Sequence, residues 1–170
     1  MDFDKICESR FSARNFSDIR VSEKKIRQII ELIRLAPTAL NHQPYKIIVA
    51  NSDKAIEKLN RAKATLYNAK SVLIICSDRD NTWANRYSGE NGILLDIGII
   101  TATALYAAAE HGLDSCCVCN FDSALLHGEF DLPDNLIADA LILLGYKTED
   151  CKPSERHSIR RAAEEFTEWL

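Results

Sequence analysis

The segment from Asn91 to His111 limits the possible folds more than any other part of this 170-residue chain. It is rich in Ala, Leu and Ile, and Gly112 follows it, as is common where a helix ends. A helix that is apolar on most sides is normally buried, either at the centre of a domain or between subunits. Its most apolar part, Ile97–Ala109, is shorter than the ~20 residues that cross a bilayer, so we expect a soluble protein with no membrane contact.

Shorter apolar segments predict the strands that would surround this helix. Four of them have strand character: Tyr45–Ala50, Ser71–Cys76, Ser115–Phe121 and Ala140–Leu144. The second is apolar almost throughout, which is typical of a strand covered on both faces. Amphipathic helices are predicted after the capping residues Ser22 and Ser52. Because strands and helices do not alternate strictly, the pattern predicts an α+β fold with a central sheet of about four strands wrapped by helices.

The composition is that of one ordinary globular domain. The chain is 46% hydrophobic and 27% charged, with a net charge of −4. That charge argues against nucleic acid as a partner, because such binders normally show a basic face, yet it allows a local basic pocket for one phosphate. The first residues lack the features of a signal peptide, so we expect a cytoplasmic protein. We expect residues 1–170 to form a single domain, whose tail at about 147–170 docks on the core or on a partner subunit.

Three of the six cysteines lie together in Cys116-Cys117-Val118-Cys119. The Cys-x-x-Cys spacing could form a redox dithiol or half of a zinc site. A complete zinc site needs a second pair of ligands, and none has a suitable spacing. We therefore expect no metal site and treat the three cysteines as structural residues of a buried strand. A thiol or metal-binding module built on Cys116 and Cys119 is the alternative; it would be colourless and inhibited by thiol blockers.

Two polar segments near the N-terminus indicate a binding site. The first is Ser9-Arg10-Phe11-Ser12-Ala13-Arg14, in which every second residue from Arg10 points to the same side of an extended chain. Two guanidinium forks with a hydroxyl between them suit a phosphate dianion. The second segment follows an apolar-striped helix and reads Ala36-Pro37-Thr38-Ala39-Leu40-Asn41-His42-Gln43-Pro44-Tyr45.

Together the two segments resemble the flavin-binding signature of the nitroreductase family, in the family's order and at its usual separation. The resemblance implies that the first segment holds the phosphate of FMN through Arg10, Phe11, Ser12 and Arg14. It also implies that Thr38, Ala39 and Asn41 lie against the flavin ring, where the amide of Asn41 can pair with the pyrimidine edge. Tyr45 stands where the family commonly has Trp.

Two further stretches resemble parts of the same family. Gly112-Leu113-Asp114-Ser115-Cys116 matches a family strand that ends in a turn, where a backbone N–H points at flavin N5. The resemblance places Val118, Cys119 and Asn120 in this turn, with the N–H of Asn120 near N5. Many relatives have Glu-Gly at Cys119-Asn120, and asparagine accepts the positive φ of glycine better than most residues. In the tail, Arg160 or Arg161 would add a positive charge at the phosphate; the alternative is a surface helix with arginine–glutamate pairs.

The resemblance thus implies a mixed or antiparallel sheet of four to five strands, in an intertwined homodimer. It implies an FMN-dependent oxidoreductase in which NADH or NADPH passes hydride, through tightly bound, non-covalent FMN, to a small nitroaromatic or quinone in a ping-pong cycle. No catalytic side chain is required, because the chemistry belongs to the cofactor. The alternatives are flavin fragmentation, reductive dehalogenation and a non-catalytic flavin carrier or sensor.

The polar segment Asp78–Asn91 is a candidate lid, whose Trp83 and Tyr87 could stack on the acceptor.

Overall fold

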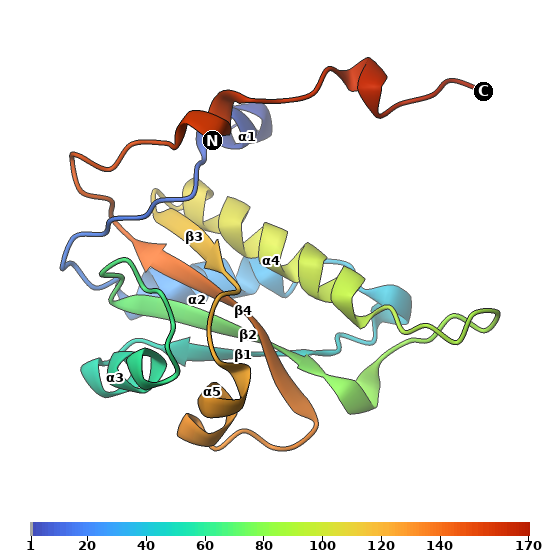
Figure 1. The fold of residues 1–170 in the computed structure, drawn as a ribbon, viewed down its shortest axis with the longest axis horizontal. Helices are drawn as coiled ribbons and strands as arrows, with labels where there is room; N and C mark the ends of the chain where they lie inside the picture. Colours follow the sequence, from blue (N-terminus) through green and yellow to red (C-terminus); the bar gives the residue numbers. More distant parts are fainter. Residues whose placement is uncertain (1) are drawn as a thin grey trace.

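A four-stranded antiparallel sheet forms the centre of the protein in the computed structural model, which describes residues 2–170 (Figure 1). The strands lie in the order β1-β2-β4-β3. Their bounds are β1 (Tyr45–Ala50), β2 (Ser71–Asp78), β3 (Asp114–Val118) and β4 (Leu136–Gly145). The predicted α+β class is confirmed, and every pairing within the sheet is antiparallel.

Helices cover both faces of this sheet. One face carries α2 (Glu23–Ile33) and α4 (Ile93–Glu110), and the other carries α3 (Asp53–Arg61) and α5 (Ser123–Glu129) (Figure 1). Alternate residues of β2 enter the two cores, with Leu73 on the α2/α4 side and Ile74 on the α3/α5 side, which explains why this strand is apolar throughout. The remaining helices are α1 (Phe3–Ser9), η1 (Ala39–Asn41), η2 (Arg79–Asn81), η3 (Glu155–Ser158) and η4 (Ala163–Glu165).

The long apolar helix α4 is buried on one side only. Ile100, Ala104 and Ala108 are buried against the sheet and α2, as expected. Leu94 and Leu95 are 69% and 71% exposed, so the helix keeps an apolar solvent face within this chain. By length and composition α4 could span a membrane, but here it packs as a core helix along the sheet.

Three strand predictions need correction, the first because β2, predicted at Ser71–Cys76, continues to Asp78. The strand predicted at Ser115–Phe121 ends at Val118, because the Asp122 carboxylate caps α5 by accepting the Leu125 N–H at 3.0 Å, which turns the chain away from the sheet. The strand predicted at Ala140–Leu144 begins earlier, at Leu136. Its first half contains Asp139, at a bulge where the carboxylate accepts the Ser77 N–H at 2.8 Å. That polar residue interrupts the apolar pattern on which the prediction relied.

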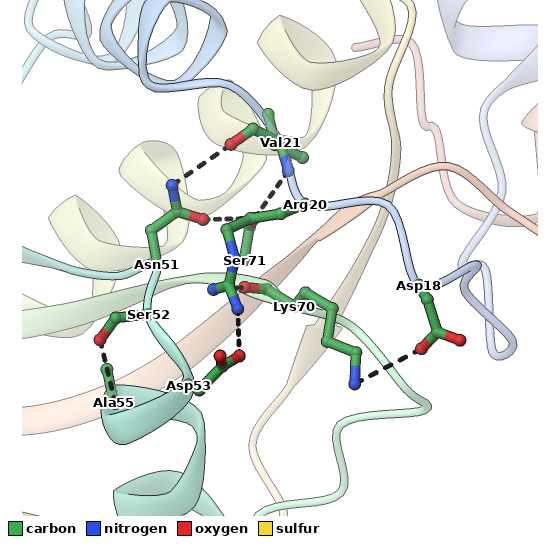
Figure 2. Close-up of polar contacts among 9 residues, drawn as sticks. All are labelled: Asp18, Arg20, Val21, Asn51, Ser52, Asp53, Ala55, Lys70 and Ser71. Atoms are coloured by element: carbon green, nitrogen blue, oxygen red, sulfur yellow. Dashed lines mark hydrogen bonds and ion pairs between the residues drawn. The ribbon is translucent and has the colours of Figure 1, made fainter.

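A polar cluster joins the chain before α2 to the start of β2 (Figure 2). The buried Ser71 hydroxyl accepts the Val21 N–H at 3.0 Å and donates to the Asn51 side chain at 2.6 Å. Asn51 completes the ring by donating to the Val21 carbonyl at 3.2 Å. Beside it, Arg20 donates to the Lys70 carbonyl and pairs with Asp53. The cluster fixes where the N-terminal segment leaves the sheet. The Arg20 side chain is engaged in these structural contacts.

The two outermost segments differ from each other. Residues 78–91 include a projecting hairpin, closed by a bridge between Ala84 and Asn91, with Tyr87 83% exposed near its tip. The C-terminal residues run away from the body of the chain (Figure 1), and Ile159, Phe166 and Trp169 are all exposed. The predicted apolar stripe of the tail therefore finds no cover within its own chain. Docking of the tail on a partner stays a prediction.

Candidate functional site

The segment Arg10–Phe16 runs beside the edge strand β3. Ser12 forms a parallel bridge with Ser115, and the Ala13 N–H donates to the Ser115 carbonyl at 3.0 Å. Ala13 is fully buried, so it faces the core. The alternation of an extended chain then turns its neighbours Ser12 and Arg14 to the other side, together with Arg10.

These side chains line one small polar cavity of about 230 Å³, called here the arginine cavity. Its walls are Arg10, Phe11, Ser12, Arg14, Ser154, Arg156, His157 and Arg160. Four guanidinium groups thus meet in a chain whose net charge is −4, and none of the lining residues is a carboxylate. The Arg10 Nη1 atom is buried and has no hydrogen-bond partner. Because an unpaired buried cation is costly, this arrangement suits an anionic ligand.

The segment is held in place by contacts on its C-terminal side. The Phe16 N–H donates to the Tyr67 carbonyl at 3.0 Å, and the Ser17 N–H donates to the Tyr146 carbonyl at 2.8 Å. The Phe16 ring is buried over Gly145, where an added Cβ would lie 2.8 Å from the ring. These backbone anchors leave the arginine side chains free for a ligand.

The tail closes the other side of the cavity. The Thr148 N–H donates to the Asn15 carbonyl at 3.2 Å, which turns the tail back over the N-terminal segment. The His157 ring then meets the Phe11 ring edge-on, with 6.0 Å between centroids. Of the two predicted tail arginines, Arg160 lines the cavity, whereas Arg161 lies over the Phe166 ring at 5.4 Å. Arg156, which the pattern did not single out, also lines it.

The second predicted segment forms a tight loop near the N-terminal end of α4. Leu40, Asn41 and Gln43 all have positive φ, between 49° and 57°. The Thr38 hydroxyl accepts the Gln43 N–H at 3.0 Å, and the Ala39 N–H donates to Asp96 Oδ1 at 3.0 Å. Asp96 is only 2% exposed, and its Oδ2 has no partner. Sequence reasoning missed this carboxylate, because it lies inside the apolar run of α4.

Within one chain the loop and the arginine cavity lie far apart. Asp96, which bonds the loop, lies in the first turn of α4. At the other end of the helix, Ala109 and Gly112 line a second cavity together with Arg10. At ~1.5 Å per residue, about 20 Å of helix separates Asp96 from Ala109. The structure therefore does not bring Thr38, Ala39 and Asn41 together with Arg10, Ser12 and Arg14 in a single chain.

The turn after β3 lies closer to the arginine cavity. Val118 is three residues beyond Ser115, the bridge partner of Ser12, or about 10 Å along the strand. The Val118 side chain is buried, whereas Cys119 and Asn120 are exposed. The expectation that all three cysteines lie in a buried strand is wrong for Cys119, which follows the end of β3.

Cys116 lies behind the arginine cavity, on the core side. Burial raises the pKa of its thiol, while Arg14, a hydrogen bond with Ser12, and Arg10 lower that pKa in part. The thiol is therefore neutral near pH 7. Among residues 2–170, no group of three or more His, Cys, Asp or Glu side chains is placed to hold a metal ion.

Comparison with known proteins agrees with this geometry. The model of the nitroreductase family matches residues 7–69 and 57–146. A nitroreductase family protein from Clostridium difficile 630 shares 33% identity, with 99% of this chain and 98% of that chain covered and a TM-score of 0.91. A protein from Exiguobacterium sibiricum, solved in complex with FMN, has a TM-score of 0.86 at 19% identity, covering 100% and 98% of the two chains.

A curated relative gives the same assignment. A protein from Archaeoglobus fulgidus, named as a candidate NADH dehydrogenase/NAD(P)H nitroreductase, is 26% identical over 153 residues and covers 86% of each chain. The family match spans the extended arginine segment, the strained loop and the whole sheet. Because the family model covers most of the chain and a solved family member shares its fold, the chain belongs to the nitroreductase family.

Proposed function

We propose that this protein is an FMN-dependent NAD(P)H oxidoreductase that reduces small oxidised acceptors such as nitroaromatics or quinones. The arginine cavity carries the proposal. It gathers four guanidinium groups without a lining carboxylate, and the Arg10 Nη1 atom is buried without a partner. A phosphate dianion would satisfy that atom and offset the clustered positive charge.

The residues present suit FMN. Arg10 and Arg14 would bind the phosphate from the N-terminal segment, with Ser12 donating its hydroxyl between them. Arg156 and Arg160 would bind it from the tail. A cavity walled by both segments suits a terminal phosphate group, which favours FMN over FAD. When bound, FMN supplies the hydride chemistry.

The edge of β3 gives the rest of the cofactor a path from the cavity to the turn at 118–120. The path begins at Ser115, the bridge partner of Ser12, and ends at Val118, about 10 Å further along the same strand. The backbone N–H of Asn120 would donate to flavin N5 from the exposed turn. The protein's role here is to bind and orient the cofactor, because hydride transfer is the chemistry of the flavin.

A second copy of the chain would complete the site. About 20 Å of α4 separates Asp96, which bonds the loop, from Ala109 beside Arg10, so we assign the loop at Thr38–Asn41 to the flavin of the partner subunit. The exposed apolar residues Leu35, Leu40, Leu94 and Leu95 give a homodimer a surface to bury. We expect the interface to exceed ~2,000 Å² in total. The exposed tail would dock across it.

The absorption spectrum of the purified protein tests the cofactor. We expect a yellow protein that releases FMN, and not FAD, on heating, with the flavin identified by mass spectrometry. NAD(P)H oxidation with a quinone then separates an enzyme from a flavin carrier. A protein that carries no flavin and takes up no added FMN would contradict the proposal.

Sedimentation at low micromolar concentration tests the shared site. Leu95→Asp should weaken the dimer and FMN binding together, because a ligand that binds only the assembled state stabilises that state. The control is Leu125→Asp, which places the same charge at an exposed leucine of α5. Removal of the tail from Lys152 should also weaken both. A monomer that keeps its FMN would show that one chain builds the whole pocket.

A further inference from the structure

Cys117 and Cys119 form a thiol pair whose sulfur atoms have no part in the proposed function. Their sulfur atoms lie 4.0 Å apart, and both thiols are free. Cys117 is half-buried near the end of β3, and Cys119 is exposed in the turn that follows. The distance is too long for a bond but short enough for the two sulfurs to meet by side-chain rotation and a small shift of the turn.

The period of the strand explains why these two cysteines meet. Side chains alternate across a strand, so Cys116 and Val118 enter the core on the α3/α5 side. Cys117 packs on the opposite side, against the α2/α4 core. Cys119, two residues further, returns to the side of Cys117. The Cys-x-x-Cys pair in the sequence, Cys116 and Cys119, is therefore split between the two faces, and the Cys-x-Cys pair shares one.

We propose that Cys117 and Cys119 are an oxidisable dithiol, which closes to an intrachain disulfide under peroxide and thereby alters the turn at 118–120. Cys119 is the exposed partner and reacts first. Its sulfur attacks one peroxide oxygen, the O–O bond breaks, and a sulfenic acid and one water form. The sulfur of Cys117 then attacks that of Cys119, the S–O bond breaks, and the departing hydroxide takes the thiol proton as a second water. The two sulfurs together lose two electrons to the peroxide.

Cys117 has the character of the resolving thiol. Burial and the neighbouring Cys119 raise its pKa to about 12, so it stays protonated and is a poor first target. Its place beside Cys119 lets it trap the sulfenic acid before further oxidation. The other cysteines lie apart from this pair: Cys116 is buried on the other face, where Cys151 packs against the same core, and Cys7 is exposed on α1.

Closure would act on the site through the backbone. The disulfide would pull the Cys119 side chain toward Cys117 and shift the Cys119–Asn120 peptide. That peptide carries the N–H assigned to flavin N5, so this part of the inference rests on the proposed function. We expect the oxidised protein to bind FMN at least about fivefold more weakly than the reduced protein. By reciprocity, bound FMN should shift the thiol–disulfide equilibrium of this pair toward the dithiol by the same factor.

Peptide mapping after peroxide treatment tests the chemistry. Cleavage before Asp114 and Asp122 releases residues 114–121, which contain all three neighbouring cysteines and no others. In the wild type this peptide should lose two hydrogens in mass and become resistant to alkylation at two positions. Cys116→Ser should still close, whereas Cys117→Ser and Cys119→Ser should not. A disulfide that survives in Cys117→Ser, or addition of oxygen to Cys119 while Cys117 stays alkylatable, would overturn the pairing.

Fluorescence titration of both forms of the wild type with FMN tests the coupling. The coupling is supported if the disulfide form binds FMN at least about fivefold more weakly than the reduced form and dithiothreitol restores the affinity. Equal affinity in the two forms would overturn the coupling while leaving the disulfide in place. Absence of FMN binding by the reduced form would instead contradict the proposed function, and peptide mapping would still decide the thiol chemistry.

Discussion

The two ends of α4 carry two different kinds of site. Beyond its C-terminal end, past a neighbouring cavity that shares Arg10, the arginine cavity is lined by four arginines, and the Arg10 Nη1 atom is buried without a partner. At its N-terminal end, the loop that contains Thr38 uses its polar groups internally, through Gln43, Asp96 and Asn81. The cavity keeps unpaired positive charge that an anionic ligand would balance, whereas the loop is already ordered by hydrogen bonds to neighbouring groups.

This contrast has an energetic basis. A non-glycine residue in the left-handed region costs on the order of 1–3 kcal/mol, and the loop has three of them at Leu40, Asn41 and Gln43. The hydrogen bonds to Thr38 and Asp96 offset part of that cost. A loop held in this way presents a fixed surface, which suits recognition of a flat ring. A cluster of like charges suits recognition of a compact anion.

Loss of an arginine from the N-terminal segment should have the largest effect. Arg10→Ala and Arg14→Ala should each weaken FMN binding about 10- to 100-fold, because a hydrogen bond to a charged group contributes ~1.5–3 kcal/mol. Fluorescence titration measures the change. Arg27→Ala is the matched control, since Arg27 pairs with Glu23 on the surface of α2. A similar loss in the control would mean that overall charge, and not the cavity, governs binding.

Changes at Asp96 should act on the other end of α4. Asp96→Ala leaves the Ala39 N–H without its acceptor, so the free energy of unfolding should fall by about 1–3 kcal/mol. Urea denaturation measures it. Asp96→Asn keeps an oxygen for that bond and should cost clearly less. If both variants lose the same stability, the carboxylate charge and not the hydrogen bond holds the loop.

The neighbouring arginines of the tail should give the smallest and most selective effect. Arg160→Ala removes one exposed cavity arginine and should weaken FMN binding about fivefold, since an exposed charged partner contributes ~1 kcal/mol. Arg161→Ala should leave affinity within about twofold, because its guanidinium lies over Phe166. Titration of the two variants in parallel decides between them. The reverse order would indicate that the tail sits differently in the flavin-bound protein.

The parts of the fold that depend on local pattern were predictable. The apolar runs predicted the strands and α4, and the alternation of Arg10, Ser12 and Arg14 predicted their common side. The features that depend on tertiary contacts could not be predicted from the sequence. Which tail arginine lines the cavity, Arg160 or Arg161, depends on how the tail packs on Phe11. The role of Asp96 could not be predicted because the residues around it in the sequence are apolar. The motif spacing pointed to Cys116 and Cys119 as the alternative thiol pair, whereas the alternation of side chains along β3 brings Cys117 and Cys119 together.

The contact between Gly145 and Phe16 limits which residues homologous proteins can carry at these two positions. The ring occupies the space that a Cβ at position 145 would need, so each residue limits the other. Any relative with a side chain at 145 must carry a smaller residue at 16 or move the whole arginine segment. The two positions should therefore change together among homologues, although they lie 129 residues apart in the sequence and neither lines the arginine cavity.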